Sequence, residues 1–559
     1  MKKFIARLSL LATSLASTVM PAAARDRPAP PPRPNVLLIL ADDLGYSDIG
    51  AFGGEIDTPN LDALAARGLR LTDFHSSPLC SPSRAMLLTG LDNHEAGLGT
   101  MAESLTPNQR GQPGYEGHLR PDTATLAEMF GAAGYRTLQS GKWHLGYAPE
   151  QDPSQRGFQY SFAHLQASHN HFGLKISADP TKGSTYRENG RTLASLPADF
   201  YSSDGFASKL IEQLAQSKAG AGANKPFFAY LAFTAPHWPL QAPAETIAKY
   251  RGRYDAGYEV LRDARVKKQA RLGLFEPPPV PRAFDVAPRW DTLTPEKKAV
   301  AARRMEVYAA MIDRIDRNVG RVIAALKASG ELDNTIIMFL SDNGADGMPL
   351  DTWPPSSSIG ARYAAADNRI ENIGAASSFE SIGPGWAEAS NSPFWRFKGH
   401  ESEGGSRVVS ILAGPRIKPG IGRVFTSIMD VAPTLLELAG IARPGNAFAG
   451  RSIRPIRGRS WAPWLAGRTD RVYASDDDVS AELIGNRAVR MDRWKLTDIG
   501  DGQWRLFDLG SDPGETRDLS AGDPGRKAEL EQRWNEYARE VGVVLPMPEQ
   551  PPAKAPGGG

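Results

Sequence analysis

Asn35-Val36-Leu37-Leu38-Ile39-Leu40-Ala41-Asp42-Asp43 is a continuous apolar run that ends in two adjacent carboxylates. An apolar run without alternation predicts a strand that is buried on both faces of a parallel sheet. Two carboxylates at the carboxyl end of such a strand are costly unless a positive charge lies between them. Because ligands of open α/β sheets gather at strand ends, this pair favours a metal site over a solvated turn, the alternative interpretation.

The same layout recurs far downstream, where Thr335–Leu340 leads into Ser341-Asp342-Asn343-Gly344. Neither pair would be convincing alone, but together they offer three carboxylates and one amide oxygen. This hard, all-oxygen set suits Ca²⁺ or Mg²⁺ and does not suit zinc. We expect one Ca²⁺, with Mg²⁺ as the lesser alternative because it keeps more water and fewer protein ligands.

Two further predicted strands end in positively charged or titratable groups. The run 136–140 leads into Gly141-Lys142-Trp143-His144, where an extended chain would project Lys142 and His144 to the same side. The run 227–233 leads into Thr234-Ala235-Pro236-His237. A single histidine is more often structural than catalytic, but the repeated placement at strand ends favours catalysis.

Helical periodicity alternates with these strands, which predicts a doubly wound α/β domain over residues 35–450. The periodic segments are 58–67, 123–133, 205–217 and 305–326. Residues 250–290 read as an insertion with possible helix. Residues 344–391 read as a long loop, either at the substrate entrance or on the surface. Residues 451–545 predict a small antiparallel sheet (strands near 487–491 and 504–509) with a helix over 526–541, before a disordered tail over 546–559.

The only cysteine, Cys80, lies in the stretch Ser77–Gly90, which predicts an apolar turn that runs into a short helix. Ser81 is the expected N-cap, Pro82 the first helical residue and Gly90 the stop. Cys80 would then sit at a helix N-terminus that favours anions, with Arg84 about one turn further in. The alternative is that Cys80 is a small buried hydrophobe.

Composition and the N-terminal segment limit the partners and the location of the protein. The 559-residue chain is 41% hydrophobic and 23% charged with a formal net charge of +2, so no nucleic-acid partner is implied. Residues 1–24 have the basic start, apolar run and alanine triplet of a secretory signal, followed by a proline-rich spacer over 25–34. The apolar run is shorter than the roughly 20 residues of a membrane span. We therefore expect cleavage near Ala24 and a periplasmic or secreted enzyme without a stable membrane anchor.

The order Cys80, Pro82, Arg84 resembles the C-x-P-x-R sequence of type I sulfatases. Further stretches resemble successive motifs of these formylglycine-dependent enzymes, which belong to the alkaline phosphatase-like superfamily: Asn35–Gly45, Cys80–Gly90, Gly141–Gly146, Pro236–Trp238, Asp342–Gly344 and Lys398–Gly405. The resemblance covers almost the whole mature chain and is closest to bacterial arylsulfatases. It implies a large, mostly parallel central sheet flanked by helices, with a small C-terminal α+β subdomain.

The resemblance also implies the chemistry. A separate maturation enzyme would oxidise Cys80 to formylglycine, whose hydrate is the nucleophile that cleaves a small-molecule sulfate ester. Ca²⁺ would be held by Asp42, Asp43, Asp342, Asn343 and the modified residue 80. Arg84 and Lys142 would hold the hydrate, and Lys142, His237 and Lys398 would grip the sulfate oxygens. His237 would protonate the leaving group, and His144 would take the proton of the second hydroxyl so that sulfate is expelled.

Three rival interpretations stay open at this point. The same nucleophile and metal could hydrolyse phosphate or phosphonate esters. An unmodified Cys80 could instead mark a pocket that only binds sulfated ligands. A plain cysteine hydrolase is the third possibility, and it predicts inactivation by alkylating reagents.

Overall fold

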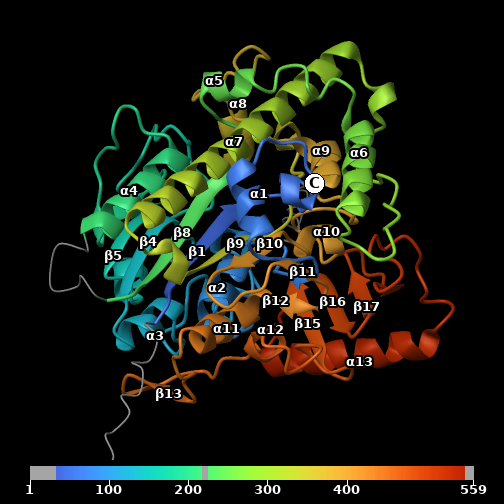
Figure 1. Ribbon diagram of the computed structural model, residues 1–559. Helices are drawn as coiled ribbons and strands as arrows, with labels where there is room; N and C mark the ends of the chain where they lie inside the picture. The colour runs from blue at the N-terminus through green and yellow to red at the C-terminus, as the bar shows by residue number, and fades with distance from the viewer. Residues whose placement is uncertain (1–32, 181, 217–224, 548–559) are drawn as a thin grey trace, which may run out of the picture. The chain divides into compact units, whose positions relative to one another are not determined.

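The computed structural model describes residues 33–180, 182–216 and 225–547 (Figure 1). The predicted signal segment 1–24 lies outside the described residues, as do most of the predicted spacer and most of the predicted tail. Across the described part of the chain, every helix is too short or too polar to cross a membrane.

The centre of the sheet is built from five parallel strands. β1 (Asn35–Asp42) lies between β9 (Thr335–Ser341) and β8 (Phe227–Pro236), and β4 (Arg136–Lys142) and β5 (Tyr160–His164) continue the sheet beyond β8. The pairs β1–β9, β1–β8, β8–β4 and β4–β5 are all parallel. The four strands predicted from apolar runs are confirmed.

Short strands complete the sheet on both sides, which has the order β11-β2-β10-β9-β1-β8-β4-β5-β6-β7 within the described residues. β10 pairs antiparallel with β9 and with β2, while β6 pairs antiparallel with β5 and with β7. Their bounds are Leu69–Leu71 (β2), Tyr186–Glu188 (β6), Arg191–Thr192 (β7), Ser410–Ala413 (β10) and Gly420–Gly422 (β11). The sheet is therefore parallel at its centre and mixed at its edges.

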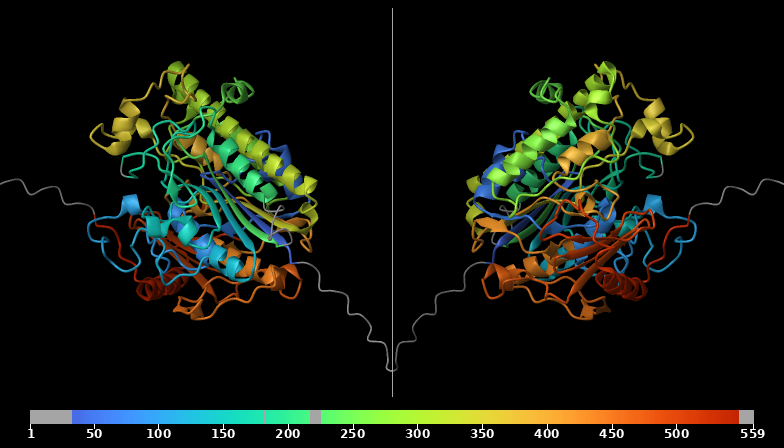
Figure 2. Two further views of the ribbon diagram at one scale, coloured as in Figure 1. Left: turned by 90° about the vertical axis from the view of Figure 1, so that its left-hand side faces the viewer. Right: turned by 90° about the vertical axis from the view of Figure 1, so that its right-hand side faces the viewer.

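Side chains of β1 alternate between two cores, one on each face of the sheet. Leu37 and Ile39 belong to one core, and Leu38 and Leu40 belong to the other. Helices cover both faces, as Figure 2 shows. The first core is covered by α1 (Pro59–Ala66), α4 (Ser202–Gln216) and α7 (Pro295–Ala328), and the second by α2 (Cys80–Thr89), α3 (Leu126–Ala132) and α11 (Val431–Leu438). The predicted doubly wound α/β class is confirmed.

Helix starts differ most from the predicted ones. α7 begins at Pro295, well before the predicted 305, because Thr294 caps it by accepting from the Lys297 N–H. Its first turn, Pro295–Lys298, is polar and mostly exposed, and only small, branched or charged residues follow it before Met305, so no clear apolar period marks its start. α3 begins at Leu126, later than predicted, because Thr125 and Glu128 form a capping box there.

The predicted start of the cysteine helix was wrong. α2 begins at Cys80, and its N-cap is the extended Leu79, not Ser81. Pro82 lies within the first turn, where its missing N–H costs nothing. The predicted stop is confirmed, since Gly90 takes a left-handed conformation and donates to the Met86 carbonyl. Cys80 is thus itself the first residue of the helix.

The predicted long loop over 344–391 was also partly wrong, because it contains α8 (Ser358–Ala364) and α9 (Gly383–Ser390). Trp386 of α9 is buried and its ring lies 5.5 Å from that of Tyr258, which starts α6 (Tyr258–Arg271). The predicted helix within 250–290 is therefore confirmed, and it packs against α9. The remaining short helices are α5 (Ala244–Ala248), α10 (Glu403–Ser406) and α12 (Ala462–Leu465).

The C-terminal region forms its own antiparallel sheet with a helix packed on it. The strands β15 (Asp478–Leu483), β16 (Asn486–Met491), β17 (Trp494–Asp498) and β18 (Arg505–Asp508) pair in sequence order. α13 (Pro524–Val541) buries Leu530, Trp534 and Tyr537 against this sheet. Two strand pairs lie elsewhere: β3 (Phe74–His75) with β12 (Thr426–Ser427), and β13 (Ala447–Phe448) with β14 (Arg451–Ser452). The exact domain boundary near residue 450 stays a prediction.

Candidate active site

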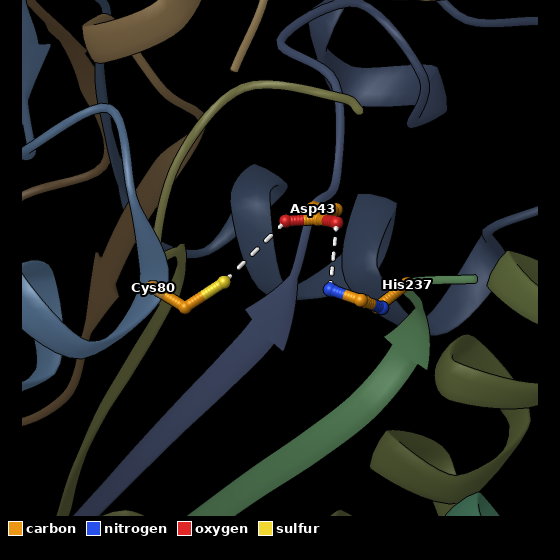
Figure 3. Close-up of side chains that lie close together, drawn as sticks. All are labelled: Asp43, Cys80 and His237. Atoms are coloured by element: carbon orange, nitrogen blue, oxygen red, sulfur yellow. Dashed lines mark hydrogen bonds and ion pairs between the residues drawn. The ribbon is translucent and has the colours of Figure 1, made fainter. Parts of the chain in front are cut away.

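The carboxyl ends of the parallel strands bring the predicted site residues together. Asp42 of β1 is in register with Pro236 of β8, and Ala41 is in register with Ser341 of β9. The residues that follow these strand ends therefore meet at one edge of the sheet. In Figure 3, Asp43 lies between Cys80 and His237, with its two oxygens directed at the sulfur and at the imidazole ring.

Three carboxylates and one thiol converge at this edge. Ligand atoms of Asp42, Asp43, Cys80 and Asp342 all lie within 4.8 Å of one another. The Cys80 sulfur is 3.3 Å from Asp42 Oδ1 and 3.7 Å from Asp43 Oδ1. Each of these side chains is almost completely buried. Burial raises the pKa of the Cys80 thiol well above its usual range, which disfavours a thiolate at this position.

Three cations contact these carboxylates. Arg84 Nε and Nη2 donate to Asp342 Oδ2 at 3.1 and 2.7 Å. Lys142 Nζ lies 2.7 and 3.0 Å from the two oxygens of Asp42. Lys398 Nζ lies 2.8 Å from Asp43. The predicted positive residues are therefore all in place around the acidic ones.

Charge compensation within this cluster is uneven. Burial would raise the pKa of Asp42, but Lys142 and Arg84 outweigh it and hold the pKa well below its usual range. For Asp43, burial dominates over Lys398, and the neighbouring carboxylates add to it, so the pKa rises to about 8. Burial also raises the pKa of Asp342. The side of the cluster formed by Asp43 and Asp342 can therefore accept more positive charge.

The donor set fits a hard divalent cation. Asn343 Nδ2 donates to Asp43 Oδ1 at 2.6 Å, while Asn343 Oδ1 is buried and has no hydrogen-bond partner among the described residues. An unpartnered buried acceptor next to under-compensated carboxylates is what a bound cation would satisfy. Because the donors are oxygens, with one sulfur from the unmodified Cys80, the residues fit Ca²⁺ or Mg²⁺ better than a softer metal.

His237 faces the cluster with one defined ring atom. Its Nδ1 is 2.6 Å from the Trp238 carbonyl, and its Nε2 is 3.6 Å from Asp43 Oδ2. Donation from Nδ1–H to a carbonyl leaves Nε2 as the free lone pair of the neutral ring. Burial and then Lys398 lower the pKa of His237 well below its usual range. The ring is therefore neutral until a negative group binds beside it.

The extended segment from which Lys142 and His144 were predicted to project to the same side does not continue as far as His144. β4 ends at Lys142, and His144 takes a left-handed conformation with φ 57°. Its Nε2 lies 2.9 Å from Glu103 Oε1. Asp43, after β1, is also left-handed with φ 67°. Non-glycine residues rarely adopt this region, and here it turns the chain sharply where two strands end at the site.

Sequence reasoning missed three residues that support the site. Asp346 accepts from Trp238 Nε1 at 2.8 Å and lies 3.4 Å from Lys398 Nζ. His171 Nε2 is 3.0 Å from the carbonyl of His237. Glu103 pairs with His144. Asp346 could have been found as one more acid in the loop that begins with Asp342, but Glu103 and His171 lie in stretches without a strand-end pattern.

The comparisons with known proteins agree on one family. The sequence model described as Sulfatase matches residues 34–441. The chain is 44% identical over 531 residues to an uncharacterized sulfatase of Schizosaccharomyces pombe, covering 92% of this chain and 94% of that protein. It is 40% identical over 437 residues to an arylsulfatase of Klebsiella aerogenes, covering 77% and 91%. A solved sulfatase from Pseudoalteromonas has the same fold, with a TM-score of 0.58 at 22% identity over 91% of each chain.

Proposed function

This chain belongs to the sulfatase family and is a sulfuric ester hydrolase, and we propose that it cleaves aryl sulfates with a formylglycine made from Cys80 and one bound Ca²⁺. The aryl preference is supported by the likeness to the Klebsiella aerogenes arylsulfatase. The role of Cys80 is supported by its place at the first turn of α2, in contact with Asp42 and Asp43.

One observation carries the proposal: three buried carboxylates, the buried cations Arg84 and Lys142, the partly buried Lys398, and His237 surround the side chain of residue 80. A sulfate monoester carries one negative charge, so its hydrolysis needs cations around sulfur that still leave a line of attack. Lys142, Lys398 and His237 would bind the sulfate oxygens. Arg84, held by Asp342, would orient the nucleophile on residue 80.

Ca²⁺ and formylglycine would supply chemistry that the twenty standard side chains lack. Ca²⁺ held by Asp42, Asp43, Asp342 and Asn343 would neutralise charge on sulfate, and formylglycine hydrate would provide one hydroxyl for attack and a second for release of sulfate. The residues themselves bind, orient and move protons. Asp43 links these parts of the site, because it contacts residue 80, Lys398 and His237.

Protonation of the leaving oxygen would fall to His237, supported by Lys398. The neutral ring has its lone pair on Nε2, so it must first become an imidazolium to donate a proton. A bound sulfate monoanion within hydrogen-bond reach of Nε2 raises the pKa of the ring and favours that form. Burial would lower the pKa of Lys398, but the neighbouring acidic groups, Asp43 first and Asp346 among them, hold it well above its usual range, so Lys398 is charged. His237 and Lys398 would together stabilise the departing phenolate.

The mass of the peptide that contains residue 80 tests the nucleophile. We expect the native enzyme to show the mass of formylglycine or its hydrate, and elemental analysis to show stoichiometric calcium. Catalytic efficiency on matched aryl sulfate and aryl phosphonate esters then defines the substrate, with sulfate expected to be preferred. A fully active preparation with an unmodified thiol at position 80, or with stoichiometric zinc, would contradict the proposal.

We also propose that the enzyme is exported after cleavage near Ala24, as its N-terminal sequence pattern predicts. The matured protein would need the formylglycine-generating enzyme as a partner before or during export. N-terminal sequencing of the native protein should begin near Arg25. Recovery of the active enzyme from the cytosol with an intact Met1 would contradict this proposal.

A further inference from the structure

We propose that Glu103 is a positioning residue for His144 and makes this histidine the base that releases sulfate, an inference that rests on the proposed function. Glu103 lies in a 3-10 turn, Ala102–Ser104, outside every motif that points to the site. In the sequence it is a single acidic residue without a neighbouring pattern that would indicate a role. The structure places its carboxylate against His144, for which no contact with the strand-end carboxylates is found within the described residues, unlike His237.

The Glu103 carboxylate contacts the His144 ring directly, and the two ring nitrogens have different surroundings. Glu103 Oε1 lies 2.9 Å from His144 Nε2, and Tyr147 donates to Glu103 Oε2 at 3.4 Å. His144 is 3% exposed. Its other nitrogen, Nδ1, is buried and has no hydrogen-bond partner among the described residues. A buried nitrogen without a partner is rare unless a substrate or reacting group completes it.

His144 is tied to the helix that carries residue 80. The Lys142 carbonyl, two residues before His144, accepts from Arg84 Nη1 at 3.4 Å. Arg84 lies one turn after Cys80 on α2. The His144 amide donates to the Leu165 carbonyl at 3.1 Å, which fixes the backbone from the other side. The left-handed turn at His144 is therefore held between α2 and the segment that follows β5.

The carboxylate selects the tautomer of the ring. Ionised Glu103 can only accept, so Nε2 must carry the proton and Nδ1 must carry the lone pair. A lone pair at Nδ1 lets His144 act as a base, which is the role that the proposed function gives it toward residue 80. In the release step, the remaining hydroxyl proton passes to Nδ1 and its O–H electron pair forms the aldehyde C=O bond. The C–O bond to sulfate then breaks with both electrons on the sulfate oxygen.

The surrounding charges explain why a partner is needed. Burial lowers the pKa of His144, and Lys142 and Arg84 lower it further, while Glu103 raises it. His164 on β5 is the other titratable group that interacts with the ring. Among the groups that act on the ring, Glu103 is thus the one that stabilises the imidazolium formed when Nδ1 takes a proton. Without Glu103, both the tautomer and the basicity of His144 would be lost.

Glu103→Gln separates this role from a structural one by kinetics. Release of phenol precedes release of sulfate, so slowing the second step lowers kcat and KM together and leaves kcat/KM unchanged. We expect kcat to fall about 100-fold, a burst of one phenol per active site, and a residue-80 peptide heavier by one SO₃ group. Glu103→Asp, which keeps the charge, should recover part of kcat.

Glu116→Gln is the matched control, because Glu116 is a partly exposed carboxylate nearby in the chain that pairs with Arg120. It should leave kcat and KM unchanged. A loss of kcat/KM in Glu103→Gln without the sulfated peptide would show a structural role and overturn the proposal. Unchanged kcat in that variant would overturn it as well.

The tautomer itself can be read without catalysis. In protein labelled with ¹⁵N-histidine, with His144 assigned from a His144→Gln variant, the ring should carry its proton on Nε2, and Glu103→Gln should remove that bias. A wild-type ring with its proton on Nδ1 would overturn the proposal. Because this measurement needs neither formylglycine nor turnover, it decides the role of Glu103 even where the residue-80 peptide refutes the proposed function.

Discussion

Two clusters of acidic and basic side chains differ in how completely their carboxylates are compensated by cations. The strand-end cluster consists of Asp42, Asp43, Asp342, Arg84, Lys142 and Lys398. The junction cluster consists of Asp73, His75, Glu403, Arg407, Arg490 and Lys495, where the C-terminal sheet meets the rest of the protein. Both contain groups of side chains that could hold a metal by distance alone. Only the charge balance distinguishes them.

In the junction cluster every carboxylate has a strong partner. Arg490 binds both oxygens of Asp73 at 3.0 and 2.7 Å, and Lys495 binds Glu403 at 2.8 Å. Although burial opposes it, Arg407 and Arg490 lower the pKa of Asp73 to about 2. At the strand ends, by contrast, the pKa of Asp43 is raised to about 8. Compensation of Asp73 and Glu403 makes the junction cluster a structural clamp, whereas incomplete compensation of Asp43 leaves the strand-end cluster ready for a cation and a substrate.

The largest expected effect comes from the residue on which the strand-end cluster converges. Cys80→Ser keeps one hydroxyl beside Arg84 but cannot be matured to an aldehyde hydrate. Attack on sulfur could occur once, and the sulfated serine would then be stuck because no second hydroxyl exists. We expect steady-state turnover to fall by at least about 10⁴-fold. Intact-protein mass spectrometry should show the sulfated serine, and repeated turnover near the wild-type rate would refute the hydrate mechanism.

Asp43→Asn should separate function from stability in the strand-end cluster. We expect activity to fall about 10³-fold, because the substitution removes a proposed Ca²⁺ ligand and the partner of Lys398. Calcium should raise the melting temperature of the wild type and not of the variant. Without calcium, the stability of the two should agree within about 1 kcal/mol, since Asp43 is mostly neutral in that state.

Chemical denaturation with and without a chelator measures the stability of the wild type and of Asp43→Asn in the two states. Chelation should also remove most of the activity of the wild type, and addition of Ca²⁺ should restore it. Asp43→Asn that kept wild-type activity, or full wild-type activity after exhaustive chelation, would show that the metal assignment is wrong.

The sequence predicted the strand-end cluster better than the junction cluster, and the reason is physical. Strand ends are marked by apolar runs such as Asn35–Ala41, and parallel pairing brings those ends to one edge. The junction cluster joins Asp73 to Arg490 across more than 400 positions of the chain, and no local pattern marks either residue. Glu103 escaped notice for the same reason, because its partner lies on a different element.

Helices were missed or misplaced where the sequence shows no alternation of apolar and polar residues at helical spacing. The first turn of α7 is polar and mostly exposed, so its cap at Thr294 is the feature that marks the start of the helix. α9 is buried almost along its whole length, so its small and aromatic residues show no polar face and resemble a loop. The start of α2 was misplaced because Ser81 is a good cap by type, while the extended Leu79 takes that position without a side-chain bond. A local cap therefore fixed the start of α7, whereas burial hid the helical period of α9.

Asp73→Asn is the counterpart of Asp43→Asn on the junction side. It leaves Arg407 and Arg490 buried with a weakened partner, and removing one member of a buried ion pair is strongly destabilising. We expect the free energy of unfolding to fall by about 3 kcal/mol. kcat and KM of the folded fraction should stay within about twofold of the wild type, since no junction residue contacts the strand-end cluster. Loss of kcat with unchanged stability would make the junction cluster functional and reverse the comparison.

The smallest expected effect is the pH dependence of that clamp. The pKa of Asp73 is about 2 in the folded protein, below its ordinary value of 3.8, because Arg407 and Arg490 outweigh burial. A lowered folded-state pKa gives stability that is present above the unfolded pKa and is lost as pH falls through the folded one. The contribution is about 2 kcal/mol at neutral pH and should disappear between about pH 4 and pH 2. Urea unfolding of the wild type and of Asp73→Asn at a series of pH values should therefore show a stability gap that is constant above pH 5 and narrows below pH 4. A gap that stays constant into the acid range would mean that Asp73 is not charged in the folded protein, and the clamp would then owe its stability to hydrogen bonds and not to ion pairs.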